Sequence, residues 1–238
     1  MKILLIGRGK MGRLLETTAA DQGDEIVAAL GRGDLAQLSA LPAADMAIDF
    51  SRPETLDAVC DYVRRTKTPL LSGTTGYTSR QLEQLRALGE SAPVLWSANY
   101  SLGIAVFYRM LSQVSDTLKA DFDIELEETH HNQKADAPSG TAKLLLNAID
   151  PKGAYTPVYG REGNTGAREK NEIGVHALRG GTVAGTHTVH FFGLDEELEI
   201  THRAASRQIF VSGALHAARL LAKKAAGSYD LQNLLFGE

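Results

Sequence analysis

Residues 2–15 read KILLIGRGKMGRLL, and this stretch predicts the fold of the first part of the chain. A short, continuous apolar run ends at Gly7, as expected for a parallel strand that is covered on both faces. Gly9 and Gly12 complete a G-x-G-x-x-G spacing, and a helical pattern over about 11–22 follows. Glycines at these positions allow a tight turn and the close approach of a pyrophosphate to the N–H groups of a helix start. The stretch therefore predicts dinucleotide binding, with an ordinary tight strand–helix turn as the alternative.

The remainder of the first hundred residues alternates between short apolar runs and stretches with helical periodicity. Four further apolar runs have the length and composition of buried strands, namely 25–30, 46–50, 68–73 and 93–98. Helical patterns lie between them at 53–65 and 79–89, the second with Ser79 as the expected N-cap. Strands that alternate with helices predict an α/β fold, here a doubly wound parallel sheet of the Rossmann type.

The pattern changes after Tyr100. A helix is expected over about 102–118, and DFDIELEE (121–128) then alternates apolar and acidic residues, as in a strand with one wet face. Three more β-rich runs follow at 173–181, 185–193 and 197–202, and a last helix is expected from about Ser206 to Lys224. These runs predict a second, α+β domain with a mixed open sheet. The Gly-, Pro- and charge-rich stretch 151–172 is expected to be a long mobile loop.

The composition narrows the classes of partner. The chain has 238 residues, 25 basic against 29 acidic side chains and a formal net charge of −4, without a block of like charge. This balance argues against a nucleic-acid surface, and the apolar run at the N-terminus is too short for a membrane span or a signal peptide. The single cysteine, Cys60, excludes an internal disulfide. We therefore expect a cytoplasmic protein without nucleic-acid or membrane partners.

Several groups are expected along the cofactor. The run after the second strand is Gly31-Arg32, without an acid before Asp34, so Arg32 and Lys10 favour the 2′-phosphate of NADP. An ordinary solvated loop arginine is the alternative for Arg32. SGTTGY (72–77) and SANYS (97–101) each follow a strand at the edge where such sheets bind ligands. Gly73, Thr74 and Thr75 are expected to line the cofactor there, with simple turn chemistry as the alternative.

Residues 128–142 read ETHHNQKADAPSGTA and predict the chemistry of the second domain. A nicotinamide supplies hydride but no proton, and a histidine such as His130 or His131 can donate one near neutral pH. Lys134 adds a cation, and the Ser139-Gly140-Thr141 run after Pro138 has the features of a helix start that binds anions. The segment therefore predicts a site for a carboxylate substrate. The alternatives are loop residues around a helix cap, or a metal held by the two histidines, which adjacent positions on an extended chain disfavour.

The segment resembles the motif E-[AT]-H-H-x-x-K-x-D-A-P-S-G-T-A of the 4-hydroxy-tetrahydrodipicolinate (dihydrodipicolinate) reductases of bacterial lysine and diaminopimelate synthesis. The resemblance extends over IDFSRP (48–53), GTTG (73–76), SANYSLG (97–103), IGVHALRGGTVAGTH (173–187) and ELEITHRAASR (197–207). It implies reduction of a cyclic hydroxy-dicarboxylate by NADPH or NADH, with loss of water. It also implies a dinucleotide-binding domain over 1–100 that the C-terminal helix at 208–238 completes, a substrate-binding and oligomerisation domain over 101–207, and a homotetramer.

The same resemblance implies roles for individual residues. His130 would donate the proton, and Lys134 would assist as a donor and substrate ligand. The substrate carboxylates would be bound by His131, Ser139, Gly140, Thr141 and Arg207, although a packing or interface role is nearly as good an interpretation of Arg207. The cofactor would be held by Gly7, Arg8, Gly9, Lys10, Met11, Gly12, Gly73, Thr74, Thr75, Ser97, Ala98, Asn99 and Tyr100. No metal is expected.

Two departures from the family pattern concern the cofactor end. Many relatives have one more residue between the first two loop glycines, and many have an acid where this chain has Gly31. Both leave the choice between NADPH and NADH open. Two other functions also remain: another NAD(P) oxidoreductase of the aspartate- or homoserine-dehydrogenase kind, and a non-catalytic dinucleotide sensor.

Overall fold

The computed structural model describes residues 1–237, which form two compact units. Unit 1 comprises Met1–Leu102 together with the segment from Gln208 onward, and unit 2 comprises Gly103–Arg207. No helix among the described residues is long and apolar enough to cross a membrane.

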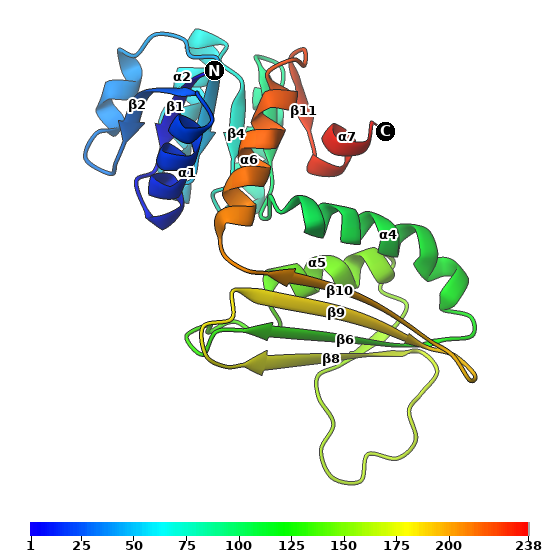
Figure 1. Cartoon of the computed structure of the whole chain (residues 1–238). Helices are drawn as coiled ribbons and strands as arrows, with labels where there is room; N and C mark the ends of the chain where they lie inside the picture. Colours follow the sequence, from blue (N-terminus) through cyan, green and yellow to red (C-terminus); the bar gives the residue numbers. More distant parts are fainter. Residues whose placement is uncertain (238) are drawn as a thin grey trace. The chain divides into compact units, whose positions relative to one another are not determined.

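Unit 1 is built on a six-stranded parallel sheet, which confirms the predicted doubly wound fold (Figure 1). Its strands are β1 (Lys2–Ile6), β2 (Glu25–Leu30), β3 (Met46–Asp49), β4 (Leu70–Ser72), β5 (Pro93–Trp96) and β11 (Gly227–Tyr229), in the order β11-β5-β4-β3-β1-β2. The central strands are buried and mostly apolar because helices cover both faces of the sheet, and the polar residues Asp49 and Ser72 stand at the ends of β3 and β4. The last strand, β11, pairs with β5 and adds an edge to the sheet from the far end of the chain.

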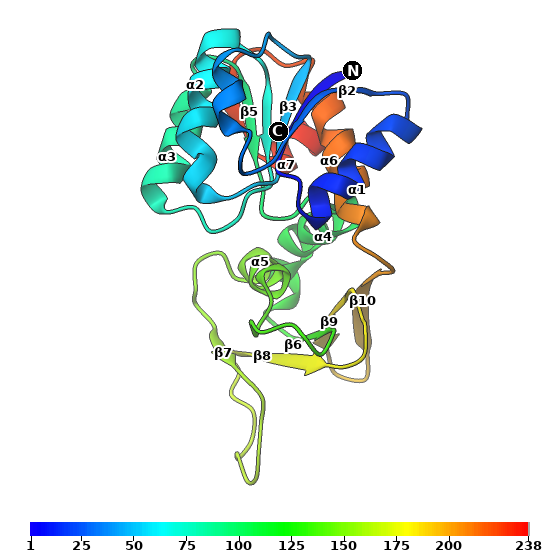
Figure 2. The ribbon, with the colours of Figure 1, turned by 90° about the vertical axis from the view of Figure 1, so that its left-hand side faces the viewer.

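Helices form a layer on each side of this sheet (Figure 2). One core cluster joins the sheet to α1 (Lys10–Asp21), α6 (Gln208–Leu221) and α7 (Leu231–Phe236). The other joins it to α2 (Leu56–Thr66), α3 (Ser79–Leu88) and the 3-10 helix η1 (Leu35–Ser39). The alanine-rich face of α6 allows close packing: Ala214, Ala217 and Ala218 are completely buried.

Unit 2 contains a five-stranded mixed sheet with α4 (Leu102–Leu118) and α5 (Gly140–Ile149) on one face (Figure 1). The strands are β6 (Asp123–His130), β7 (Thr156–Val158), β8 (Glu172–Arg179), β9 (Gly185–Phe192) and β10 (Glu197–Ala204), in the order β10-β9-β6-β8-β7. Strand β6 pairs parallel to β8 and antiparallel to β9. Every second residue of β6 is buried toward the helices, as its alternating sequence predicts.

Several local predictions need correction. The N-cap of α3 is Thr78 and not Ser79, because Thr78 is extended and its Oγ1 accepts the N–H of Gln81 in a capping box. The helix predicted at 53–65 begins with a 3-10 turn, η2 (Pro53–Thr55), before α2. The predicted loop 151–172 contains strand β7, and its Arg161 and Arg168 form hydrogen bonds with Glu125.

Candidate active site

The glycine loop between β1 and α1 has the geometry that close backbone packing requires. Gly7 has a φ of +102°, and a Cβ there would lie 2.3 Å from the carbonyl oxygen of Phe50. A Cβ on Gly12 would lie 1.8 Å from the carbonyl oxygen of Gly7, so only glycine allows this turn. A Cβ on Gly9, in contrast, would meet no atom within 4 Å. Gly9 is also the N-cap of α1 and offers no side-chain cap, so the helix start faces open space.

A hollow of about 290 Å³ lies at this loop. Three of its lining residues carry guanidinium groups, and none of the described residues that line it carries a carboxylate. The lining residues are Gly7, Arg8, Gly9, Leu30, Gly31, Arg32, Leu35, Phe50, Ser51, Arg52 and Thr55. Asp34, the first acid after the second strand, accepts the N–H of Gly31 at 2.9 Å instead of lining the hollow. A helix N-terminus with free space in front of it and three neighbouring arginines can bind the phosphates of a pyridine dinucleotide, including a 2′-phosphate.

A buried carboxylate organises the loops beyond β3 and β4. Asp49 is 1% exposed and accepts hydrogen bonds from the hydroxyls of Ser51, Ser72, Thr74 and Tyr77. Burial raises the pKa of Asp49, and these four hydrogen bonds oppose that rise. The side chain of Thr74 is therefore directed to Asp49 at 2.9 Å, whereas Thr75 is exposed and Gly73 packs directly on the ring of Phe50.

Among the residues predicted from SANYS (97–101), some side chains also point into unit 1 while others are exposed. Ser97 Oγ donates to the carbonyl of Asn99 at 2.7 Å, which closes a local turn, and Ala98 is exposed. Tyr100 is buried, and its hydroxyl donates to the carbonyl of Ser72 at 2.7 Å. Tyr100 thus supports β4 from within the core of unit 1, whereas Ala98 lies on the surface.

In unit 2 a second buried carboxylate joins the predicted site residues. Glu128 is completely buried, and its Oε2 lies 2.5 Å from Nδ1 of His130. Its Oε1 accepts the N–H of Ser139 at 3.0 Å, and the two terminal nitrogens of Arg179, Nη1 and Nη2, each donate to the carboxylate at 2.8 Å. Burial alone would raise the pKa of Glu128, but the hydrogen bonds from Arg179, His130 and Ser139 outweigh it and lower the pKa. Glu128 is therefore ionised, and its carboxylate is stabilised by hydrogen bonds from Arg179, His130 and Ser139.

The imidazole of His130 is held by Glu128 at one nitrogen, and its other nitrogen faces the backbone of Gly185. With Nδ1 on Glu128, Nε2 faces Gly185, where a Cβ would lie 3.1 Å away. The ring of His187 meets that of His130 edge to face, with the centroids 5.1 Å apart. Burial, and then the charge of His130, lower the pKa of His187 to about 4. His187 is therefore neutral near pH 7, and of the two rings the described contacts place only that of His130 at hydrogen-bond distance from a carboxylate.

The start of α5 forms the next part of this cluster, and it confirms Ser139 as the N-cap. The Oγ of Ser139 accepts the N–H of Ala142 at 3.0 Å. Gly140 is exposed, and a Cβ there would meet nothing within 4 Å. Thr141 is half-buried at the same helix start. An open, capped helix N-terminus of this kind favours an anion by its dipole and its N–H groups.

The three other residues predicted to bind substrate or donate a proton are Lys134, His131 and Arg207. Lys134 Nζ donates to Asp136 at 2.8 Å, and His131 is half-buried beside it in the same turn. Arg207 is exposed at the end of unit 2. Unit 2 also has a hollow of about 620 Å³, and none of the predicted site residues lines it. Its lining residues are Ala137, Pro138, Lys143, Tyr159, Gly160, Val175, His176, Ala177 and Leu178.

Three residues of the cluster were not predicted from the sequence as site residues: Glu128, Arg179 and His187. Glu128 had a signal, because it lies two residues before His130 and so shares its face of a strand. Arg179 and His187 belong to β8 and β9, within the stretch 173–187 that resembles the family, but nothing in that stretch shows that they approach His130. Only the pairing of β6 with both strands brings them to His130.

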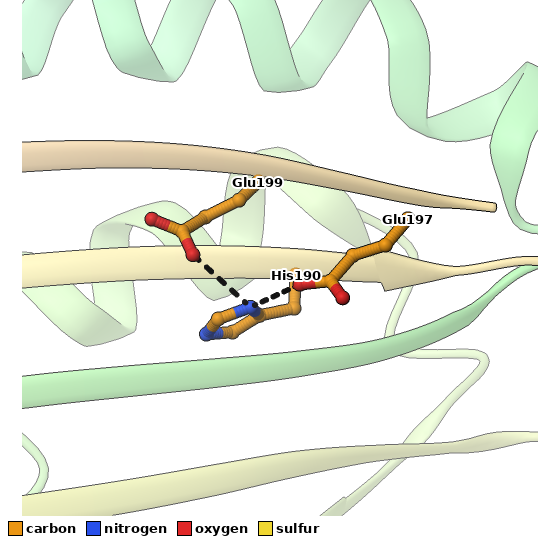
Figure 3. A group of neighbouring side chains, drawn as sticks. All are labelled: His190, Glu197 and Glu199. Atoms are coloured by element: carbon orange, nitrogen blue, oxygen red, sulfur yellow. Dashed lines mark ion pairs between the residues drawn. The ribbon is translucent and has the colours of Figure 1, made fainter.

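One group among the described residues has a donor set suited to a metal ion. His190, Glu197 and Glu199 have ligand atoms within 4.8 Å of one another on β9 and β10 (Figure 3). The Nδ1 of His190 lies 3.6 Å from Glu197 and 3.7 Å from Glu199, as in ordinary ion pairs. Both carboxylates are about half exposed, and none of the three residues touches the Glu128 cluster. Their arrangement is that of cross-strand charge pairs on the surface of a sheet.

Comparison with known proteins agrees with this geometry. Family models described as Dihydrodipicolinate reductase, N-terminus, and Dihydrodipicolinate reductase, C-terminus, match residues 1–100 and 103–235. A 4-hydroxy-tetrahydrodipicolinate reductase of Clostridium tetani is 40% identical over 99% of this chain and 97% of its own length. The protein of the same name from Staphylococcus saprophyticus is 41% identical over 98% of this chain and all of its own length, 100%.

Solved structures show the same fold. The dipicolinate-bound dihydrodipicolinate reductase of Paenisporosarcina sp. TG-14 has a TM-score of 0.79 at 24% identity, covering 98% of this chain and 99% of its own. An amine dehydrogenase of Mycobacterium smegmatis has a TM-score of 0.63 at 11% identity, covering 96% and 94%. The predicted resemblance is confirmed by the family models and the full-length relatives, and the chain belongs to the dihydrodipicolinate reductase family.

Proposed function

We infer that this chain is the reductase that converts 4-hydroxy-tetrahydrodipicolinate to tetrahydrodipicolinate with NADPH or NADH, in the diaminopimelate route to lysine. Membership of the family and curated relatives of that name, matched along their full lengths, support this activity. The two alternatives, another small-substrate oxidoreductase and a dinucleotide sensor, have no comparable support: the amine dehydrogenase is only 11% identical to this chain.

The observation that carries the mechanism is the contact between Glu128 and Nδ1 of His130. A bound nicotinamide supplies hydride and no proton, so the protein must supply the proton. The carboxylate stabilises the protonated imidazole and keeps Nδ1–H bonded, so the proton leaves from Nε2, on the side of Gly185. His187 stays neutral because of its lowered pKa of about 4, so His130 is the acid of the pair.

We propose that the dicarboxylate is held mainly at the start of α5. The Ser139–Thr141 segment supplies a helix N-terminus, and Gly140 leaves space in front of it. Lys134 would exchange its ion pair with Asp136 for a substrate carboxylate, since the carboxylate of Asp136 is more than half exposed and can turn away into solvent. His131 and Arg207 would complete the positive surroundings. The assignments of Lys134, His131 and Ser139–Thr141 follow the motif at 128–142, and that of Arg207 follows the resemblance at 197–207.

The dinucleotide would bind along the β1–α1 loop. Gly7, Gly9 and Gly12 allow its pyrophosphate to approach the start of α1, and Arg8, Arg32 and Arg52 surround the hollow beside it. The absence of a carboxylate from that lining supports a preference for NADPH over NADH. Lys10 and Met11 are at the first turn of α1, and Gly73, Thr75 and Ala98 would contribute backbone groups at the strand ends.

Two broader properties remain proposals. A homotetramer assembled through unit 2 is proposed from the family resemblance, and a cytoplasmic location is proposed from the biosynthetic role. The decisive experiment for the activity is a coupled assay with freshly generated 4-hydroxy-tetrahydrodipicolinate, run with NADPH and NADH separately. Oxidation of the nucleotide only in the presence of this substrate supports the proposal. Binding of the nucleotide without turnover of any cyclic dicarboxylate would favour the sensor instead.

A further inference from the structure

The proton donor of the proposed function shares its carboxylate with a permanent cation. Oε2 of Glu128 lies 2.5 Å from Nδ1 of His130 and 2.8 Å from Nη1 of Arg179. Nη2 of Arg179 contacts the other oxygen at 2.8 Å, so the guanidinium forms a bidentate pair. A single buried negative charge therefore faces two positive partners, and only one of them can lose its proton at physiological pH.

The surroundings of His130 contain few other charges. Glu128 on β6 and His187 on β9 contact the imidazole of His130 directly. The charged or titratable groups that act on these neighbours are Arg179 on β8, His202 on β10, and Lys134 and Asp136 in the loop after β6. His187 is neutral, and Lys134 is paired with Asp136 at 2.8 Å. Glu128 and Arg179 are thus the charges that act most directly on the imidazole.

We propose that Glu128 and Arg179 are positioning residues that set the acidity and the tautomer of His130 by opposite effects. This inference rests on the proposed function, in which His130 donates the proton. Glu128 stabilises the imidazolium and directs the proton to be lost from Nε2. Arg179 neutralises part of the same charge, so the imidazolium is stable enough to form and yet acidic enough to donate. When Nε2 gives up its proton, the neutral ring keeps Nδ1–H on Glu128 and charge is conserved.

Arg179 has a second effect on the same segment. Its Nη2 donates to the carbonyl of Asp136 at 2.7 Å, and Asp136 in turn pairs with Lys134. Glu128 also holds the backbone of Ser139 at 3.0 Å, immediately before α5. The Glu128–Arg179 pair therefore fixes both ends of the stretch 130–139, so the acid and the anion site keep a constant relation within unit 2.

The test uses two variants with opposite expected effects on the pH profile of kcat/KM. Glu128→Gln presents an amide; its oxygen satisfies Arg179, and its NH2 then faces Nδ1 as a donor. The imidazolium is destabilised, so the alkaline limb of the profile should move to lower pH by about one to three units. Arg179→Gln leaves the negative charge to His130 alone, so the limb should move to higher pH. Glu127→Gln, which removes the same charge from the opposite face of β6, is the matched control and should leave the limb in place.

Nitrogen-15 spectra of histidine-labelled enzyme give a readout that a purely structural role would not move. The neutral ring of His130 should carry its proton on Nδ1 in the parent enzyme and on Nε2 in Glu128→Gln. Limbs that stay fixed in both variants, with an unchanged tautomer, overturn the inference even if His130→Gln is inactive. The converse result, a shifted tautomer of His130 together with a fully active His130→Gln variant, removes His130 as the donor but leaves its positioning by Glu128 and Arg179 intact. Arg179→Lys, which keeps the charge and loses the bidentate geometry, should give a smaller shift and serves if Glu128→Gln does not fold.

Discussion

Ser139 Oγ lies 3.1 Å from Nε2 of His187, and both side chains are buried. The same oxygen accepts the N–H of Ala142, so its own proton is available for the imidazole. This bond joins the start of α5 to β9, across 48 residues of chain. When Ser139 donates, Nε2 of His187 carries no proton, so protonation of His187 would reverse the direction of this bond and place a charge in the buried cluster.

We predict that the stability of the protein falls on acidification partly because of His187. Its pKa is lowered from 6.5 to about 4 in the folded protein by burial, and then by the charge of His130. Between these two pH values the unfolded chain binds a proton at His187 and the folded chain does not. The free energy of unfolding is therefore highest above pH 6.5 and decreases as the pH falls toward 4. The total decrease due to His187 is about 3 kcal/mol.

Urea unfolding at a series of pH values measures this contribution. His187→Gln, whose amide oxygen can still accept from Ser139, should lose less stability between pH 6.5 and 4 than the parent protein. His216→Gln changes an exposed histidine on α6 and is the matched control. Parallel pH dependence of the parent and His187→Gln would contradict the prediction.

Gly9→Ala should weaken nucleotide binding without destabilising the fold. A Cβ at this position meets no protein atom within 4 Å, so it fits the structure but occupies the space in front of the α1 start. We expect a loss of about tenfold or more in NADPH affinity, equivalent to about 1.4 kcal/mol. Fluorescence titration with NADPH measures it, and Gly33→Ala, which also meets nothing within 4 Å, is the control. Equal affinities of the two variants would remove the pyrophosphate from this loop.

Arg32→Ala should reduce the preference for NADPH. A lost charge-assisted hydrogen bond to the 2′-phosphate corresponds to about 1.5–3 kcal/mol, or roughly 10–100-fold in KM. The KM for NADH should stay almost unchanged because NADH has a hydroxyl in place of that phosphate. Steady-state kinetics with both nucleotides decide this, and an equal loss for the two would show that Arg32 does not read the phosphate.

His130→Gln should lower kcat by roughly 10²–10⁴-fold, with a much smaller effect on substrate binding. The amide can occupy the place of the imidazole near Glu128 but has no acidic proton to give. Single-turnover kinetics at saturating nucleotide separate the chemical step from binding. Unchanged turnover in this variant would exclude His130 as the proton donor.

Lys134→Ala should raise KM and lower kcat together, because the residue is proposed both to bind a carboxylate and to assist proton donation. The exposed Lys152→Ala is a matched control that removes the same charge from the surface. Initial rates over a range of substrate concentrations measure both parameters. A change confined to the affinity for NADPH would contradict the assignment.

Much of the active-site segment could be predicted from local sequence. The order of strand, glycine loop and helix at 2–22 predicts the parallel sheet, because few other arrangements bury such runs on both faces. The Ser139 cap is also local, since it needs only an extended residue before a helix. Ser79 was the wrong cap because Thr78 and Ser79 are chemically similar and only the backbone conformation distinguishes them. Strand β11 was missed because it has three residues and no periodicity.

For the predicted cofactor residues, the sequence indicated correctly that they follow the strands, but it did not indicate which of their side chains are exposed. Thr74 and Tyr100 lie at strand ends as expected, yet their hydroxyls hold Asp49 and the carbonyl of Ser72 inside unit 1. A hydroxyl after a strand can face a ligand or a buried carboxylate, and the choice depends on which loops pack around it. Asp49 itself lies in a run that appears entirely apolar apart from this one acid.

The sequence by itself determined the alternation of strands and helices, the glycine turn and the motif that carries His130, Lys134 and the start of α5, because each depends on residues near one another along the chain. The tertiary structure alone decided which charges surround His130. Arg179 reaches Glu128 across 51 residues, and His187 reaches Ser139 across 48, through the pairing of β6 with β8 and β9. Strand pairing follows from the burial of one face of the whole sheet, a property that no single segment of the sequence contains.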